Sequence, residues 1–346
     1  MQVKTTRRLA WLALPLSLAL VAGACGSDDD DEGTGDSSGE DTGGEEQDFS
    51  GQSINISGSS TVEPISAIVA EEFDATTGAT TTVDGPGTGD GFELFCTGET
   101  DISDASRPID EEEEVPVCEE NGVEYVEIQV AYDGMAVMTS PNNEAVECLN
   151  FADLYAMVGP EAEGFGNWSD GQAIATELGS DTELPDVALD LTGPGTESGT
   201  YDSFIEIALE GIAEERGQEA TTRTDYDSNS DDNIIISNIE GSDSSLGWVG
   251  WAYAKEQGDA VRNIPIASEP GGDCVEVADE TISDGSYPLS RPLFIYVNKA
   301  NAEENEALAG YVDFYLDGLD DWVAESGYVV QPEDQTQAAI EAWEAR

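Results

Sequence analysis

A turn rich in hydroxyl groups, residues 57–61 with the sequence SGSST, stands between a strand-like and a helix-like segment. Ile54 and Ile56 alternate with polar residues before it, as in a half-buried strand. Pro64 follows where a first helical turn would begin, and apolar residues at helical spacing continue to Gly78. Hydroxyl groups and free N–H groups at the positive end of a helix dipole can bind an anion. The alternative is an ordinary N-cap, which the same residue types form.

The same arrangement occurs twice more along the chain. Residues 85–91 (GPGTGDG) separate a strand-like run from the apolar residues 92–95. Residues 193–200 (GPGTESGT) lead from the apolar run 187–191 into another helical pattern. Three such turns, far apart in sequence, predict that several helix N-termini converge on one anion.

One cation stands out near these turns. Arg107 is the only Lys or Arg between residues 26 and 215, and it lies in the segment 101–109, DISDASRPI, at the end of a short strand-like stretch. An arginine in so acidic a stretch is expected to pair with something specific, either a buried carboxylate or an anionic ligand.

The elements that would position these residues alternate between strand and helix. Residues 125–130 and 234–236 are strand-like, and residues 150–157 and 201–212 show helical spacing. This alternation predicts an α/β fold with parallel sheets, and the length allows more than one lobe.

The first residues have the pattern of a secretory signal. Basic residues precede an apolar run from Leu9 to Ala22, which is too short to span a bilayer, and small residues then lead to Cys25. We expect a signal peptide over 1–24, lipidation of Cys25, and an acidic disordered tether over 25–50. Ordinary cleavage near the same site is the alternative.

The cysteine count agrees with export. Beyond Cys25, the remaining cysteines are Cys96, Cys118, Cys148 and Cys274, an even number that fits disulfides in an oxidising compartment. We expect Cys96 to pair with Cys118 and Cys148 with Cys274, while the sequence leaves three connectivities open. A zinc site is less well supported, because the chain has no His and no CxxC spacing. No metal or other cofactor is expected.

The net charge limits the partners. With 11 Lys and Arg against 75 Asp and Glu, the formal charge is −64. Such a chain repels nucleic acid and anionic membrane surfaces, so membrane contact is expected only through the lipid. The acidity suits a protein kept in solution at high salt.

Four segments taken together resemble the phosphate-binding protein of the high-affinity phosphate ABC transporter, the PstS family. Residues 57–65 resemble its first binding loop, 101–109 its DISDASRPI segment, and 193–200 its second-lobe loop. Residues 287–296 resemble the segment that crosses back to the first lobe. The likeness extends over nearly all of residues 52–320.

The resemblance implies a type II periplasmic-binding-protein-like fold, in which two α/β lobes joined by a two-stranded hinge close on the ligand. Lobe 1 would comprise residues 51–133 and 291–346, lobe 2 residues 134–290, and the hinge would lie near 131–134 and 290–291. By this resemblance the phosphate-binding residues are Ser60, Thr61, Val62, Thr88, Ser106, Arg107, Ser198, Gly199 and Thr200.

The chain departs from the family pattern at two positions. Some relatives carry an arginine where this chain has Pro194, and an aspartate where it has Ser106. Arg107 is therefore expected to supply the ligand cation from the first lobe. The carboxylate that accepts the phosphate proton is left open between Asp104 and Glu197.

The resulting hypothesis is a monomeric lipoprotein on the outer face of the cell membrane. It would capture inorganic phosphate and deliver it to the permease subunits of an ABC transporter. Another tetrahedral oxyanion, sulfate, is the alternative; it carries no proton and needs no carboxylate acceptor. An enzyme is not expected, because a chain without His has neither a Ser-His-Asp triad nor a His-ligated metal.

Overall fold

The computed structural model describes residues 47–196 and 198–346. Residues 46–346 form one compact unit. The predicted signal peptide, Cys25 and almost all of the predicted tether lie outside the described residues. Within the described ranges, no helix is both long and apolar enough to cross a membrane.

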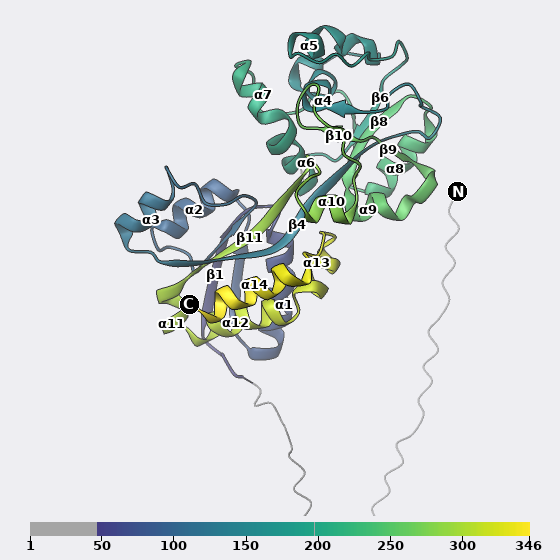
Figure 1. Cartoon of the computed structure of the whole chain (residues 1–346). Coiled ribbons are helices and arrows are strands. Elements are labelled where there is room, and N and C mark those ends of the chain that lie inside the picture. Colours follow the sequence, from purple (N-terminus) through teal and green to yellow (C-terminus); the bar gives the residue numbers. More distant parts are fainter. Residues whose placement is uncertain (1–46, 197) are drawn as a thin grey trace, which may run out of the picture. The chain divides into compact units, whose positions relative to one another are not determined.

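Two long antiparallel strands run through the centre of the fold (Figure 1). They are β4 (Tyr125–Thr139) and β11 (Ser290–Asn298), and they pair from Asn298 opposite Tyr125 to Ser290 opposite Gly134. Beyond Gly134, β4 changes partner and pairs with β8 from Met135 onward. One strand thus belongs to both halves of a nine-stranded sheet with the order β2-β1-β3-β11-β4-β8-β6-β7, with β9 also paired to β4.

The first half of the sheet contains the parallel strands that precede the loops predicted to bind phosphate. They are β1 (Ser53–Gly58), β2 (Thr80–Asp84) and β3 (Ile102–Ala105). Alternate residues of β11 enter different hydrophobic clusters: Leu293 and Ile295 pack with α1, whereas Phe294 and Tyr296 pack with α2. Side chains alternate across a strand, so helices cover both faces. These helices are α1 (Glu63–Thr77), α2 (Thr88–Cys96), α3 (Val115–Asn121), α11 (Lys299–Glu304), α12 (Glu306–Asp317), α13 (Leu319–Ser326) and α14 (Glu333–Glu344).

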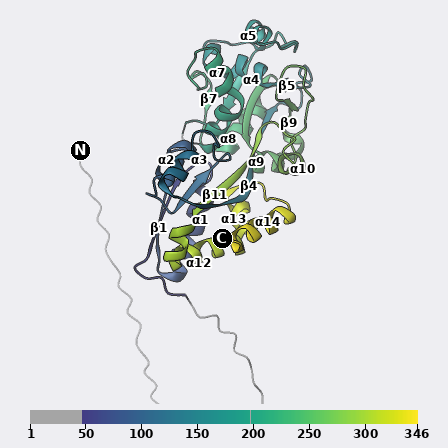
Figure 2. The same ribbon diagram turned by 60° about the vertical axis from the view of Figure 1, so that its left-hand side comes forward.

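The second half of the sheet has its own hydrophobic core, centred on Trp168, Phe204 and Trp248. Its strands are β6 (Asp190–Gly193), β7 (Asp227–Ser228), β8 (Ser245–Gly250) and β9 (Arg262–Asn263), with β5 (Leu149–Asn150) and β10 (Ile266–Ala267) as a separate pair. Its helices, all but α6 labelled in Figure 2, are α4 (Phe151–Val158), α5 (Gln172–Glu177), α6 (Gly199–Phe204), α7 (Glu210–Glu215), α8 (Asp232–Gly241), α9 (Trp251–Ala254) and α10 (Asp279–Ser283). The 3-10 turns are η1 (Pro160–Ala162), η2 (Trp168–Gly171) and η4 (Lys255–Ala260), and η3 (Ile205–Leu209) is a π-helical turn joining α6 to α7.

Most predicted elements are confirmed, but one is wrong, and the main sheet is mixed where parallel sheets were expected, because β11 and β4 pair antiparallel with each other and with β3 and β8. Residues 150–157 form α4 with Asn150 as its cap, and residues 201–212 lie within α6, η3 and α7. Residues 234–236, predicted as a strand, lie inside α8. Ile235 and Ile239 are fully buried while Ile234 is 44% exposed, which is the spacing of one helix face. A run of three apolar residues is too short to distinguish the two states.

Both predicted disulfides are present. Cys96–Cys118 joins α2 to α3, and Cys148–Cys274 joins the segment before β5 to the segment before α10. The predicted lobe boundaries stay a prediction, which the exchange of partners by β4 at Gly134 supports.

Candidate functional site

The hydroxyl-rich turn after β1 is held by its backbone. Gly58 has φ +153°, and a Cβ there would lie 2.0 Å from the carbonyl oxygen of Asp104, so this close approach requires glycine. Ser59 N–H donates to that same carbonyl at 2.8 Å. Helix α1 begins at Glu63, and its N-cap, Val62, makes no side-chain capping bond. The hydroxyl groups of Ser60 and Thr61 are therefore not occupied in capping α1 and instead bond to residues outside the loop.

The second turn brings two predicted site residues together. Thr88 begins α2, and Ser106 follows β3. Their hydroxyl groups share a hydrogen bond of 3.0 Å, and the backbone N–H of Ser106 donates to Thr88 Oγ1 at 3.2 Å. Sequence positions 18 residues apart thus present neighbouring hydroxyl groups.

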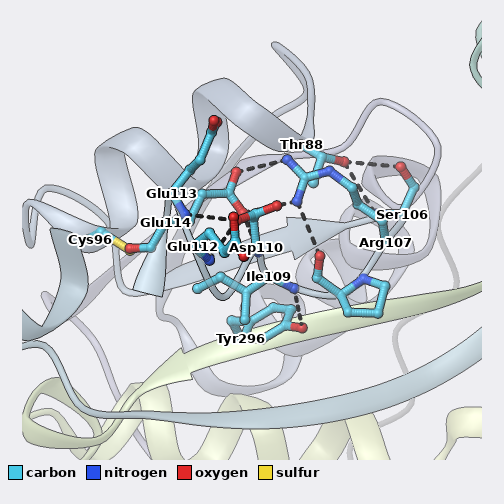
Figure 3. A network of polar contacts seen from close by, with 11 residues as sticks. Thr88, Cys96, Ser106, Arg107, Ile109, Asp110, Glu112, Glu113, Glu114 and Tyr296 are labelled. Carbon is cyan, nitrogen blue, oxygen red and sulfur yellow. Dashed lines mark hydrogen bonds and ion pairs between the residues drawn. The ribbon is translucent and has the colours of Figure 1, made fainter. Parts of the chain in front are cut away.

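Arg107 pairs with a carboxylate, although not with a fully buried one as its sequence context predicts. Its guanidinium binds both carboxylate oxygens of Glu114, at 2.9 and 2.7 Å, and also donates to the carbonyl of Pro108 (Figure 3). The arginine side chain remains 46% exposed and the glutamate 17%. The pKa of Arg107 is raised, first by this hydrogen bond to Glu114. A carboxylate of its own chain is therefore the partner in this structure, and a phosphate contact stays a prediction.

The third turn approaches the first. Ser198 accepts a hydrogen bond from the N–H of Thr200 at 3.2 Å, so here the ordinary N-cap is present. A Cβ on Gly199 would lie 3.6 Å from the carbonyl oxygen of Ser60, which places the start of α6 against the first loop. Glu197, a predicted proton acceptor, lies outside the described residues.

Two side chains of α6 hydrogen-bond to the first loop. Ser60 Oγ donates to Asp202 Oδ2 at 3.0 Å, and the hydroxyl groups of Thr61 and Ser203 lie 3.3 Å apart. Burial raises the pKa of Asp202, against the opposing effect of the bond from Ser60.

Arg291, which the sequence interpretation placed at the hinge and not in the binding set, lies among these groups. Its Nη2 donates to Thr61 Oγ1 at 3.0 Å and to Ser203 Oγ at 2.7 Å, and its Nη1 to Glu206. Asp133, its cross-strand partner on β4, lies 3.7 Å from its Nε. Burial raises the pKa of Asp133, and the charge of Arg291 opposes that shift. A guanidinium only 11% exposed therefore links the first loop, α6 and the central strand pair.

A cavity of about 520 Å³ lies beside this cluster. Both Arg107 and Arg291 line it, together with Pro86, Gly87, Thr88, Gly89, Asp90, Ser106, Glu206, Ile207 and Glu210. Two guanidinium groups and two hydroxyl groups can donate to an anion there. The carboxylates that share the cavity can accept a proton from one.

A larger cavity, about 630 Å³, lies elsewhere, against β6 and α8. Its buried arginine, Arg223, is fully engaged. Nε bonds Asp225, Nη1 bonds the carbonyl of Met157, and Nη2 bonds Asp225 and the carbonyl of Phe165. This cavity offers no comparable cation to an anion.

Asp104 lies beneath the first loop and not at the cavity wall. It is fully buried, and Oδ1 accepts a hydrogen bond from Ser66 at 2.9 Å. Oδ2 has no hydrogen-bond partner among the described residues. Burial raises the pKa of Asp104 to about 7, and the charge of Glu63 adds to that shift.

Sequence reasoning missed Arg291, Asp202, Ser203 and Glu206 as neighbours of the first loop. A signal for Arg291 existed, since few cations occur and this one lies in the segment 287–296 singled out from the sequence, most of which belongs to β11. Neither Asp202 nor Glu206 differs in pattern from the many other acids of the chain.

Hydroxyl, amide and guanidinium donors from distant segments, gathered where β4 and β11 join two α/β halves, define a two-lobed solute-binding protein. Among the described residues, no group of three or more acidic or cysteine side chains could hold a metal ion. Comparison with known proteins agrees. The model of the PBP superfamily domain matches residues 36–318.

Individual relatives and solved structures are similar over most of the chain. Protein SphX of Synechocystis is 38% identical over 286 residues, covering 82% of this chain and 80% of the relative. The phosphate-binding protein PstS of Staphylococcus haemolyticus is 32% identical, covering 92% of this chain and 90% of the relative. The crystal structure of a possible phosphate binding protein from Planctomyces limnophilus superimposes with a TM-score of 0.77 at 36% identity, covering 86% of this chain and 98% of that one.

The chain belongs to the PBP superfamily and, within it, to the PstS family. The expected two-lobed α/β fold is confirmed. The family is one of solute-binding receptors and not of enzymes.

Proposed function

We propose that this protein captures inorganic phosphate outside the cytoplasmic membrane and delivers it to the permease of an ABC transporter. The observation that carries the proposal is the position of Arg291. Through Nη2 its guanidinium donates to both Thr61 of the first loop and Ser203 of α6, beside a cavity that Arg107 also lines. The names of the PstS relatives support phosphate as the ligand.

Oxyanion binding in this site would use donors at short range. The hydroxyl groups of Ser60, Thr61, Thr88 and Ser106 and the backbone of Val62 and of residues 198–200 are proposed to donate to phosphate oxygens. Arg107 and Arg291 would supply the full positive charges, each able to engage two oxygens. This set extends the binding residues predicted from the sequence by one, Arg291.

Phosphate is favoured over sulfate by an acid at the cavity, Asp90, which lines it. Protonated phosphate can donate a hydrogen bond to a carboxylate, whereas sulfate at neutral pH has no proton and meets only repulsion. The choice between Asp104 and Glu197 as the acceptor stays a prediction.

Isothermal titration with phosphate, sulfate and arsenate tests the proposal. We expect phosphate and arsenate to bind and sulfate to bind far more weakly. Saturable binding of sulfate alone would contradict the assignment. Release of product from a chromogenic phosphoester would contradict a purely binding role.

The location rests on the N-terminal pattern. We propose that Cys25 carries the lipid that holds the protein at the outer face of the membrane, with the protein itself a monomer. Cys25→Ser, expressed in its own host, should release the protein into the medium. An intact mass without acyl groups in the wild type would rule the anchor out.

A further inference from the structure

Glu206 lies in the π-helical turn η3, one turn after Asp202 on the same helical stretch. Its side chain is 44% exposed and lines the cavity that Arg107 and Arg291 share. Residues four apart on a helix face the same way. Asp202 and Glu206 therefore present two carboxylates toward the groups proposed to bind phosphate.

The contact that Glu206 makes is with the ligand-binding arginine itself. Oε2 of Glu206 accepts a hydrogen bond from Nη1 of Arg291. The other terminal nitrogen, Nη2, donates to the hydroxyl groups of Thr61 and Ser203. Of the two terminal nitrogens of Arg291, Nη1 is therefore the one that is hydrogen-bonded to a carboxylate. The charge of Glu206 also acts on Arg107, where it adds to the larger effect of Glu114 in raising the pKa of that guanidinium.

We propose that Glu206 is a built-in competitor for the ligand, whose carboxylate occupies the guanidinium of Arg291 and is displaced by a phosphate oxygen. This inference rests on the proposed function and adds to it a residue that limits affinity. A carboxylate and a phosphate are both anionic acceptors for the same N–H groups, so one is exchanged for the other. Limited affinity lets a receptor release its ligand to a permease, because tighter binding mostly slows dissociation.

The chain offers a matched control one turn further along. Glu210 lines the same cavity and begins α7. Burial raises its pKa, and the nearby charges of Glu206 and Glu214 add to that shift. In the part of the chain that the structure describes, no hydrogen bond or ion pair joins Glu210 to an arginine. Glu210→Gln therefore removes a cavity charge without removing a competitor.

The test measures phosphate affinity by isothermal titration for the wild type, Glu206→Gln and Glu210→Gln. A neutral amide is a weaker acceptor than a carboxylate, so Glu206→Gln should bind phosphate about tenfold more tightly. Glu210→Gln should gain less, and its gain should vanish in molar salt, where long-range repulsion is screened. The gain from Glu206→Gln should persist there, because the contact is direct.

A double-mutant cycle locates the effect. Combined with Arg291→Ala, the change Glu206→Gln should no longer tighten binding, because the group for which it competes is absent. If Glu206 instead accepts the phosphate proton, Glu206→Gln would weaken phosphate binding and narrow the preference over sulfate. That outcome, or an unchanged affinity, would overturn the inference while leaving phosphate capture in place. A wild type that did not bind phosphate would overturn the proposed function itself.

Discussion

Replacement of Arg107 by alanine tests the cation predicted from the sequence. In a phosphate complex the guanidinium would make two charge-assisted bonds, each contributing about 1.5–3 kcal/mol. The structure lowers the expected loss of binding free energy, because Arg107 must share or break its ion pair with Glu114, whose oxygens it binds at 2.9 and 2.7 Å. A half-exposed ion pair of this kind contributes about 0–1 kcal/mol. Taking the lower end for the two bonds, about 3 kcal/mol in all, leaves a net loss of about 2–3 kcal/mol, so Arg107→Ala should bind phosphate roughly 30- to 140-fold more weakly.

Two further variants separate ligand binding from the surface ion pair. Glu114→Gln frees Arg107 and should keep or raise phosphate affinity, while Arg107→Lys should restore only part of it, since an ammonium lacks the planar fork. All are measured by isothermal titration at one fixed salt concentration. The reasoning is refuted if Arg107→Ala binds within about twofold of the wild type while Arg291→Ala loses more than tenfold. Arg107 would then serve only to bind Glu114.

The remaining predictions concern stability. Replacing Cys96 and Cys118 by serine should lower the free energy of unfolding by about 3 kcal/mol in the chain-entropy account, measured by urea titration; an unchanged midpoint would contradict it. The folded-state pKa of Asp104, about 7, lies above its usual 3.8, so the folded chain holds the extra proton and stability falls as pH rises through this window. Asp104→Asn should remove this pH dependence. The free energy of unfolding of the variant should therefore gain on that of the wild type between pH 4 and pH 8, by at most about 4 kcal/mol at about 1.4 kcal/mol per pKa unit. Equal pH slopes for both proteins would refute this. The thermal midpoint should rise from dilute to molar potassium chloride, because screening relieves the repulsion behind a net charge of −64, and a flat trend would oppose it.

Local chemistry explains which parts of the fold could be predicted. The strand, turn and helix around residues 54–78 follow from alternation, a proline in the first turn and Gly78 in the left-handed conformation at the helix end. The prediction of a strand over residues 234–236 is wrong because the features that distinguish a helix from a strand lie outside this apolar run. Asp231 accepts a hydrogen bond from Asn233 N–H as the cap of α8, and the core of the second half buries one helix face.

The site was harder to predict than the fold, for two different reasons. Glu114 is one of four consecutive glutamates, and sequence alone cannot say which of them binds Arg107. Arg291 reaches Thr61 only because β11 pairs with β4 in a register that sets Arg291 opposite Asp133. Such a pairing between strands distant in sequence depends on the whole sheet and not on local pattern.

A strongly acidic chain can bind an anion because the repulsion from its surface carboxylates acts over long distances, whereas the groups that bind the anion act at contact distance. Charges more than about 10 Å apart are largely screened at 0.1 M salt, so the many surface carboxylates slow the approach of phosphate more than they weaken its bound state. Inside the site three carboxylates are matched by cations: Glu114 faces Arg107, and Glu206 and Asp133 face Arg291. Binding phosphate there exchanges one anionic partner for another and adds hydroxyl donors from Ser60 and Thr61, without bringing a dianion to an unshielded acidic surface. Affinity is then decided by which anion the two guanidinium groups prefer, and that preference depends on the few residues that touch them.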